Sequence, residues 1–150
     1  MSHSPFKRLA VAGLAAAILA GCTTTTRLEG AQPGTTLKIV GYQDTTLPRT
    51  EDLASKSTGQ HLFMATGPDG KKMYGLLPLR VNGGTMAMSI LFFAPALAIG
   101  GFRDSFNFYE VDVEQNVLRY KMKSEDQWRT YNPLKEEAER SRAAFEGGTH

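Results

Sequence analysis

FNFYEVDVEQNVLRYKMK, residues 106–123, is the stretch that decides the fold class. Apolar and charged residues alternate on both sides of Gln115-Asn116, and a period of two is typical of half-buried strands. A two-residue turn at Gln115-Asn116 aligns apolar with apolar and acidic with basic residues: Val113 with Leu118, Val111 with Tyr120, Tyr109 with Met122, Asp112 with Arg119 and Glu110 with Lys121. The stretch therefore predicts an antiparallel hairpin with one solvated, charged face.

Further strands are predicted upstream of this hairpin. Residues 35–42 (TTLKIVGY) form one candidate. The apolar runs 60–66 and 72–79 enclose the turn signal Gly67-Pro68-Asp69-Gly70, which predicts a second hairpin. The polar stretch 43–59 predicts a long loop that contains one helical turn.

The end of the chain has the signals of a helix. Asn132-Pro133 is a typical start and Gly147 a plausible stop, which predicts a helix over residues 133–146. One side of it carries a weak apolar stripe, formed by Leu134, Ala138, Ser141 and Phe145. We therefore expect a single α+β, mainly β domain over residues 35–150, built as a small antiparallel sheet or sandwich with a C-terminal helix.

The beginning of the chain reads PFKRLAVAGLAAAILAGC from Pro5 to Cys22. A short basic start, an apolar run and a small-residue end are typical of a secretory signal peptide. The run is shorter than the roughly 20 apolar residues of a membrane span. Removal of residues 1–21 leaves 15 Lys plus Arg against 15 Asp plus Glu, so the mature charge is zero. Such a balance gives no electrostatic case for a nucleic-acid partner.

Leu19-Ala20-Gly21-Cys22 resembles the lipobox of bacterial lipoproteins. The resemblance implies a diacylglycerol on the sulfur of Cys22, cleavage between Gly21 and Cys22, and acylation of the new amino terminus. Cys22 is also the only cysteine, which excludes an intramolecular disulfide. Thr23, in place of the Asp that retains such proteins in the inner membrane, implies the outer membrane facing the periplasm in a Gram-negative host. Residues 22–34 are rich in Thr, Gly and Pro and predict a lipidated tether.

Residues 81–102 (VNGGTMAMSILFFAPALAIGGF) carry no charge. A buried core element is one interpretation, since apolar runs of about 10–14 residues are more often buried than spanning. In a second, the segment dips into the membrane through Leu91, Phe92, Phe93 and Ile99. The third is an interface with a partner or another copy.

The sequence contains few residues in patterns typical of catalytic or metal-binding sites. His61 is the only histidine away from the two ends, so no Cys/His metal cluster can form, and it is interpreted as a strand residue near a sheet edge. No serine-nucleophile motif and no phosphate-binding glycine motif occurs. Trp128 is interpreted as a plug of the core. We expect no enzyme activity, no metal and no cofactor.

A weaker resemblance concerns Gln32–Ile39 (QPGTTLKI) and Ser57–His61 (STGQH), which are similar to parts of PEGA-type repeats. These are small β domains of bacterial envelope proteins. Together the patterns predict a non-enzymatic, lipid-anchored envelope protein that binds or scaffolds a partner in the periplasm. The alternative is a lipid-anchored inhibitor, such as an immunity protein against a periplasmic toxin.

Overall fold

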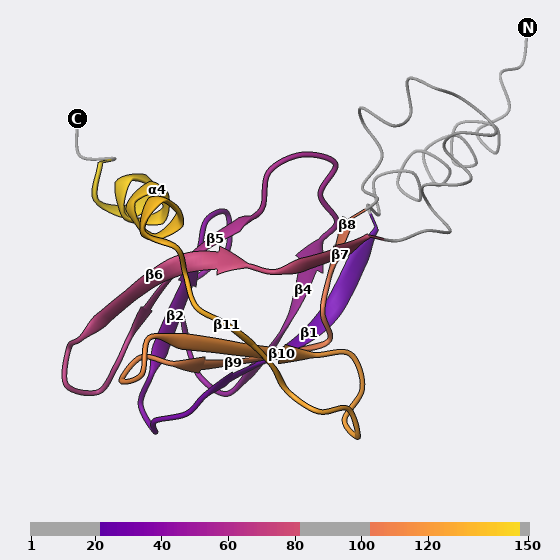
Figure 1. The fold of residues 1–150 in the computed structure, drawn as a ribbon, viewed down its shortest axis with the longest axis horizontal. Coiled ribbons are helices and arrows are strands. Elements are labelled where there is room, and N and C mark those ends of the chain that lie inside the picture. Colours follow the sequence, from indigo (N-terminus) through magenta and orange to yellow (C-terminus); the bar gives the residue numbers. More distant parts are fainter. Residues whose placement is uncertain (1–21, 82–102, 148–150) are drawn as a thin grey trace, which may run out of the picture.

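The computed structural model describes residues 22–81 and 103–147. The elements, in chain order, are β1 (Thr23–Gly30), β2 (Thr36–Ile39), β3 (Thr45–Thr46), β4 (Arg49–Ala54), β5 (His61–Thr66), β6 (Lys72–Leu77), β7 (Leu79–Val81), β8 (Arg103–Ser105), β9 (Phe108–Asp112), β10 (Val117–Lys121), β11 (Arg129–Tyr131) and the helix α4 (Lys135–Glu146). The predicted class, α+β and mainly β with a C-terminal helix, is confirmed (Figure 1).

The strands form three sheets. A five-stranded sheet has the order β11-β10-β9-β1-β4, a four-stranded sheet has the order β3-β2-β5-β6, and β7 pairs with β8. The larger sheet is mixed, because β1 runs parallel to β9 and antiparallel to β4. Both large sheets contribute to one apolar core, which includes Leu28, Leu53, Tyr109 and Leu118 from the first, and Leu37, Phe63, Met73 and Leu77 from the second.

The predicted tether over residues 22–34 is wrong for most of its length, because residues 23–30 are the strand β1. This strand lies between β9 and β4, in the interior of the five-stranded sheet. Thr26 and Leu28 point inward and are buried, at 0% and 1% exposure. The hydroxyl of Thr26 donates to the carbonyl of Phe106 at 2.9 Å, which satisfies the polar atom in the core. β-Branched threonine therefore serves here as a strand former.

The predicted loop over residues 43–59 is also wrong. It contains β3 and β4, and β4 pairs with β1 in a register that places Thr23 opposite Ala54 and Leu28 opposite Arg49. Leu53 is the apolar side chain that β4 contributes to the core, and it is fully buried. With a single large apolar residue, β4 lacks the alternation from which a strand is predicted.

The hairpin over residues 106–123 forms, but its register differs by two residues from the prediction. Leu118 pairs with Val111 and Arg119 with Glu110, so residues 113–116 make a four-residue turn. Asp112 begins this turn and its carboxylate accepts a hydrogen bond from the Gln115 amide at 3.1 Å. Asn116 closes the turn at φ 55°. This turn chemistry, typical of Asp and Asn, decided the register; the faces are unchanged, because a shift of two preserves the side-chain alternation.

Arg119 joins two carboxylates on the charged face of the hairpin, where Asp112 is buried. Its guanidinium lies 2.5 Å from Glu110 and 3.3 Å from Asp112. Burial raises the pKa of Asp112, but hydrogen bonds from Gln32, from the Gln115 amide and from Arg119 outweigh it and lower the pKa below its ordinary value. The charged stripe of the sequence is therefore an ion-pair network on the sheet.

The second predicted hairpin is confirmed: β5 and β6 pair antiparallel, with His61 opposite Leu77 and Thr66 opposite Lys72. Gly70 adopts φ 84° in the connecting turn, a conformation that glycine reaches without steric cost. Pro78 separates β6 from β7, as expected of a residue that has no amide donor.

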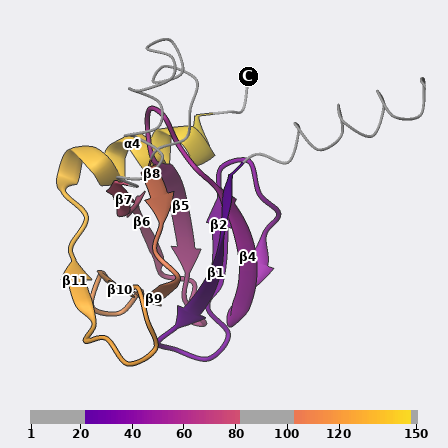
Figure 2. The same ribbon diagram turned by 90° about the vertical axis from the view of Figure 1, so that its right-hand side faces the viewer.

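Helix α4 lies across β6 and β5 on the side away from the core, which Figures 1 and 2 both show. It begins at Lys135 rather than Pro133, and the carboxylate of Glu137 accepts the Leu134 amide at 3.0 Å. Ser141 is fully buried and donates to the carbonyl of Phe63 at 2.6 Å. Leu134, in contrast, stays 61% exposed, so the predicted apolar stripe is only partly used. No helix among the described residues has the length and apolar character needed to cross a bilayer.

Candidate functional site

Cys22 lies where the interior strand β1 begins, at one end of the strands of the five-stranded sheet. Its side chain is exposed, and its carbonyl accepts a hydrogen bond from the Ser55 amide at 2.8 Å. This bond continues the β1–β4 ladder, in which Thr23 pairs with Ala54. The backbone of Cys22 is thus part of the folded domain, and only its side chain projects from it.

Val81 and Arg103, the described residues on either side of residues 82–102, lie near Cys22. Val81 pairs with Arg103, and Arg103 forms a second bridge with Lys56, next to Ser55. The amide of each residue in that bridge donates to the carbonyl of the other, at 2.9 and 3.1 Å. We call this group the anchor edge; it consists of Cys22, Ala54, Ser55, Lys56, Val81 and Arg103.

Several of the predicted site residues fall outside the described residues. These are Gly21, on the amino-terminal side of the predicted cleavage bond, and the four apolar residues Leu91, Phe92, Phe93 and Ile99. The first residue of the apolar segment, Val81, is 59% exposed, and Arg103, which follows its last residue, is half-buried. Of the predicted site residues the structure therefore places Cys22 alone, and Val81 and Arg103 belong to the same group of residues.

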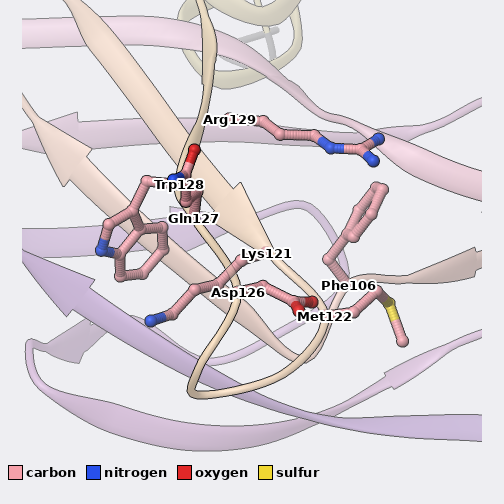
Figure 3. A pocket seen from close by; sticks show the side chains of 7 residues that line it. All are labelled: Phe106, Lys121, Met122, Asp126, Gln127, Trp128 and Arg129. Carbon is pink, nitrogen blue, oxygen red and sulfur yellow. The ribbon is translucent and has the colours of Figure 1, made fainter.

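A pocket of about 390 Å³ lies at the other side of the five-stranded sheet, where the segment between β10 and β11 folds back. We call it the loop pocket; its lining residues are Phe106, Lys121, Met122, Asp126, Gln127, Trp128 and Arg129. Figure 3 shows Trp128 and Lys121 on one side of it, and Phe106 and Met122 on the other. Asp126 shapes the loop, since its carboxylate accepts the Lys123 amide at 2.9 Å.

Lys121 and Trp128 form the best-defined contact of the loop pocket. The ammonium of Lys121 lies 4.4 Å from the centroid of the Trp128 ring and 5.6 Å from that of Phe108. It also donates to the carbonyl of Ser124 at 2.7 Å. Trp128 is half-buried, so its interpretation as a core plug is wrong. The spacing of Lys121 and Trp128 across a Ser-Glu-Asp loop was the signal in the sequence that could have indicated this pocket.

His61 begins β5, an interior strand, and is 1% exposed, so its predicted place near a sheet edge is wrong. Its Nε2 lies 2.9 Å from the Ala54 carbonyl, and the ring of Tyr42 packs edge-on against it at 5.7 Å. Because a carbonyl can only accept, Nε2 carries the proton of the neutral ring. Burial lowers the pKa of His61 from its ordinary 6.5, the bond to Ala54 opposes this, and Lys56 lowers it further.

The buried His61 predicts a pH-dependent stability. Its pKa is lower in the folded chain than in the unfolded chain, so the unfolded state takes up a proton first as pH falls. The free energy of unfolding should therefore fall once the pH drops below about 6.5, by at most about 1.4 kcal/mol per pH unit. Urea titrations between neutral and mildly acidic pH measure this slope. The His61→Gln variant should have a smaller slope; an identical slope in both proteins would contradict the prediction.

Within residues 22–81 and 103–147, no three His, Cys, Asp or Glu side chains lie close enough together to hold a metal ion. Comparisons with protein-family models, with curated proteins and with solved structures gave no match. The lipobox and the PEGA-like segments therefore stay predictions from the sequence.

The two features differ in what they can do. The anchor edge presents an exposed thiol, whose sulfur is the most nucleophilic side-chain atom and a suitable acceptor for an acyl-bearing group. The loop pocket presents an aromatic ring, cationic groups and an apolar wall, a combination that is common in protein-binding surfaces.

Proposed function

We propose that this chain is a non-enzymatic lipoprotein of the cell envelope, which binds a protein partner while acyl chains on Cys22 hold it at a membrane. One observation carries the proposal: the thiol of Cys22 is exposed, and the residue that follows begins an interior strand of the domain. An anchor at that sulfur attaches the sheet itself to the bilayer. Each buried methylene contributes about 0.8 kcal/mol, so two or three chains hold the protein permanently.

The apolar segment supports the same orientation. Its first residue, Val81, and Arg103, which follows its last residue, belong to the anchor edge together with Cys22. Leu91, Phe92, Phe93 and Ile99 lie between these two residues in the sequence. We assign them to contact with the acyl boundary of the bilayer. In a Gram-negative cell, Thr23 after the lipidated cysteine directs the protein to the outer membrane, facing the periplasm.

The loop pocket is the surface that we assign to the partner. Tryptophan and arginine are enriched among the residues that dominate binding energy at interfaces, and Trp128 and Arg129 line this pocket. Arg129 is exposed, and β11, to which it belongs, is an edge strand of the five-stranded sheet.

Replacing Cys22 tests the anchor. In cells that express the full chain, the Cys22→Ser variant should shift from the membrane fraction to the soluble fraction or accumulate with residues 1–21 still attached. Mass spectrometry of the amino-terminal peptide should find acyl groups on Cys22 of the wild type. The Thr25→Ala variant, which alters an exposed side chain of β1, is the matched control and should stay in the membrane. A wild-type Cys22 that carries no lipid would refute the anchor.

Site-specific cross-linking tests the partner surface. A photoreactive residue at Gln127 should capture one envelope protein in intact cells, whereas one at Lys72, exposed at the start of β6, should not. Capture of a protein made by the same cell supports scaffolding. Capture only of an added toxin supports the alternative, a lipid-anchored inhibitor. Equal capture from both positions would contradict the assignment of the loop pocket.

A further inference from the structure

A second cavity, of about 250 Å³, lies between the start of β8, helix α4 and the outer side of β5 and β6. It is lined by Gly59, Gln60, Leu62, Leu76, Arg103 and Arg140, and we call it the arginine cavity. Arg103 belongs also to the anchor edge, so the cavity opens beside Cys22's end of the domain. Leu76, only 3% exposed, gives it an apolar floor.

The guanidinium of Arg103 is held in place by a hydrogen bond, and one of its N–H groups has no partner among the described residues. Its backbone forms both hydrogen bonds of the bridge to Lys56, and its Nη2 donates to the Gly59 carbonyl at 2.7 Å. Its Nε is buried and has no acceptor among the residues that the structure describes. A buried donor without a partner costs about 1–3 kcal/mol, which a bound acceptor would recover.

The charges around the cavity are of one sign. Arg140 is exposed on α4, and within residues 22–81 and 103–147 it forms no ion pair and no acidic side chain lines the cavity. Each arginine has one carboxylate next to it in the sequence: Asp104 accepts a hydrogen bond from Ser55 at 2.6 Å and lies 3.4 Å from Arg80, and Glu139 lies 3.9 Å from Lys135. In a chain whose acidic and basic residues balance after residue 21, this is a local concentration of positive charge.

We propose that the arginine cavity binds a phosphate group, with the guanidinium groups of Arg103 and Arg140 as donors. Arginine presents its donors in a planar fork that matches phosphate oxygens. The apolar floor suits a phosphate that carries an organic substituent. A phospholipid headgroup and a soluble phosphate ester share this chemistry, and the position beside the anchor edge makes the headgroup accessible to an anchored protein.

The test uses the full chain purified in maltoside micelles, which contain no phosphate. Calorimetric titration with inorganic phosphate, and separately with glycerophosphoglycerol, measures binding of the soluble group. To test the lipid source, micelles are doped with phosphatidylglycerol or, as a control, with diacylglycerol, which has no phosphate. Binding of the headgroup is read from the protection of Arg140 against modification by phenylglyoxal. Arg140→Gln and Arg103→Gln should each weaken binding about tenfold, as expected for loss of one charge-assisted hydrogen bond. Arg129→Gln removes an exposed arginine of the loop pocket and is the control; it should have no effect.

Each outcome decides the proposal. Binding in the soluble arm alone supports a phosphate site that serves a free ester, and protection by phosphatidylglycerol supports the lipid headgroup. Absence of binding in both arms, or binding that neither arginine variant weakens, overturns the proposal. Because Arg140 is exposed, Arg140→Gln should fold even if Arg103→Gln does not. The soluble arm needs no membrane, so this result is independent of whether Cys22 carries a lipid.

Discussion

Truncation of Leu28 to alanine should destabilise the domain by about 2–5 kcal/mol, the usual cost of deleting a fully buried leucine side chain. Leu28 is 1% exposed, lies in β1 only six residues after Cys22, and belongs to the core shared by the two large sheets. The stability of a domain of this size is itself only about 5–15 kcal/mol. Urea unfolding of residues 22–150, followed by the fluorescence of the single tryptophan, measures the loss.

The control for Leu28→Ala is Thr23→Ala, at an exposed position of the same strand. It should change the free energy of unfolding by less than about 0.5 kcal/mol, as surface substitutions usually do. Equal stability of Leu28→Ala and the wild type would mean that residues 23–30 are not a core strand, and that the tether predicted from the sequence was right.

Tyr109→Phe should cost about 2–4 kcal/mol, although it removes a single oxygen atom. The buried hydroxyl of Tyr109 accepts the Phe106 amide at 2.9 Å and donates to the Pro78 carbonyl at 2.5 Å. Its loss leaves two backbone groups without their partner in the core. Burial also raises the pKa of Tyr109, so the hydroxyl remains a donor at every physiological pH. The oxygen thus joins the end of β6 to the segment before β9.

The matched control is Tyr120→Phe. Tyr120 is half-buried and its ring packs against Phe106 with the centroids 4.6 Å apart, but its hydroxyl makes no hydrogen bond within the described residues. The same chemical change should therefore be nearly neutral there. Equal losses for the two variants would contradict the prediction, because they would show that the two hydrogen bonds of the Tyr109 hydroxyl do not set the cost.

The fold class could be predicted from the sequence because the strongest alternation, that of residues 106–123, belongs to strands with one face in the core. Leu118 and Val111 are buried as expected, while Arg119 stays with its acidic neighbours on the other face. The register could not be predicted from side-chain pairing alone, because both registers pair apolar with apolar residues. The hydrogen bond from the Gln115 amide to Asp112 distinguishes them, and it depends on backbone geometry.

The strands β1 and β4 could not be predicted because they are short of apolar residues. β1 contributes Thr26 and Leu28 to the core, and β4 contributes only Leu53. Their burial results from pairing with one another and with β9, which are tertiary interactions that a local pattern does not contain. The arginine cavity was missed for the same reason, since Arg103 and Arg140 are 37 residues apart in the sequence and meet only in the fold.

The parallel pairing of β1 with β9 has a consequence for the order of assembly. Arg27 and its partner Phe108 are 81 residues apart, so the first strand to be synthesised acquires its second neighbour only when most of the chain exists. Contacts so distant in sequence slow folding. A nascent or truncated polypeptide that ends before residue 108 would present one side of β1 as an open edge, ready to pair with another molecule. Ribosome stalling or proteolysis before β9 should therefore yield aggregation-prone fragments, whereas cleavage after β11 should leave the sheet intact.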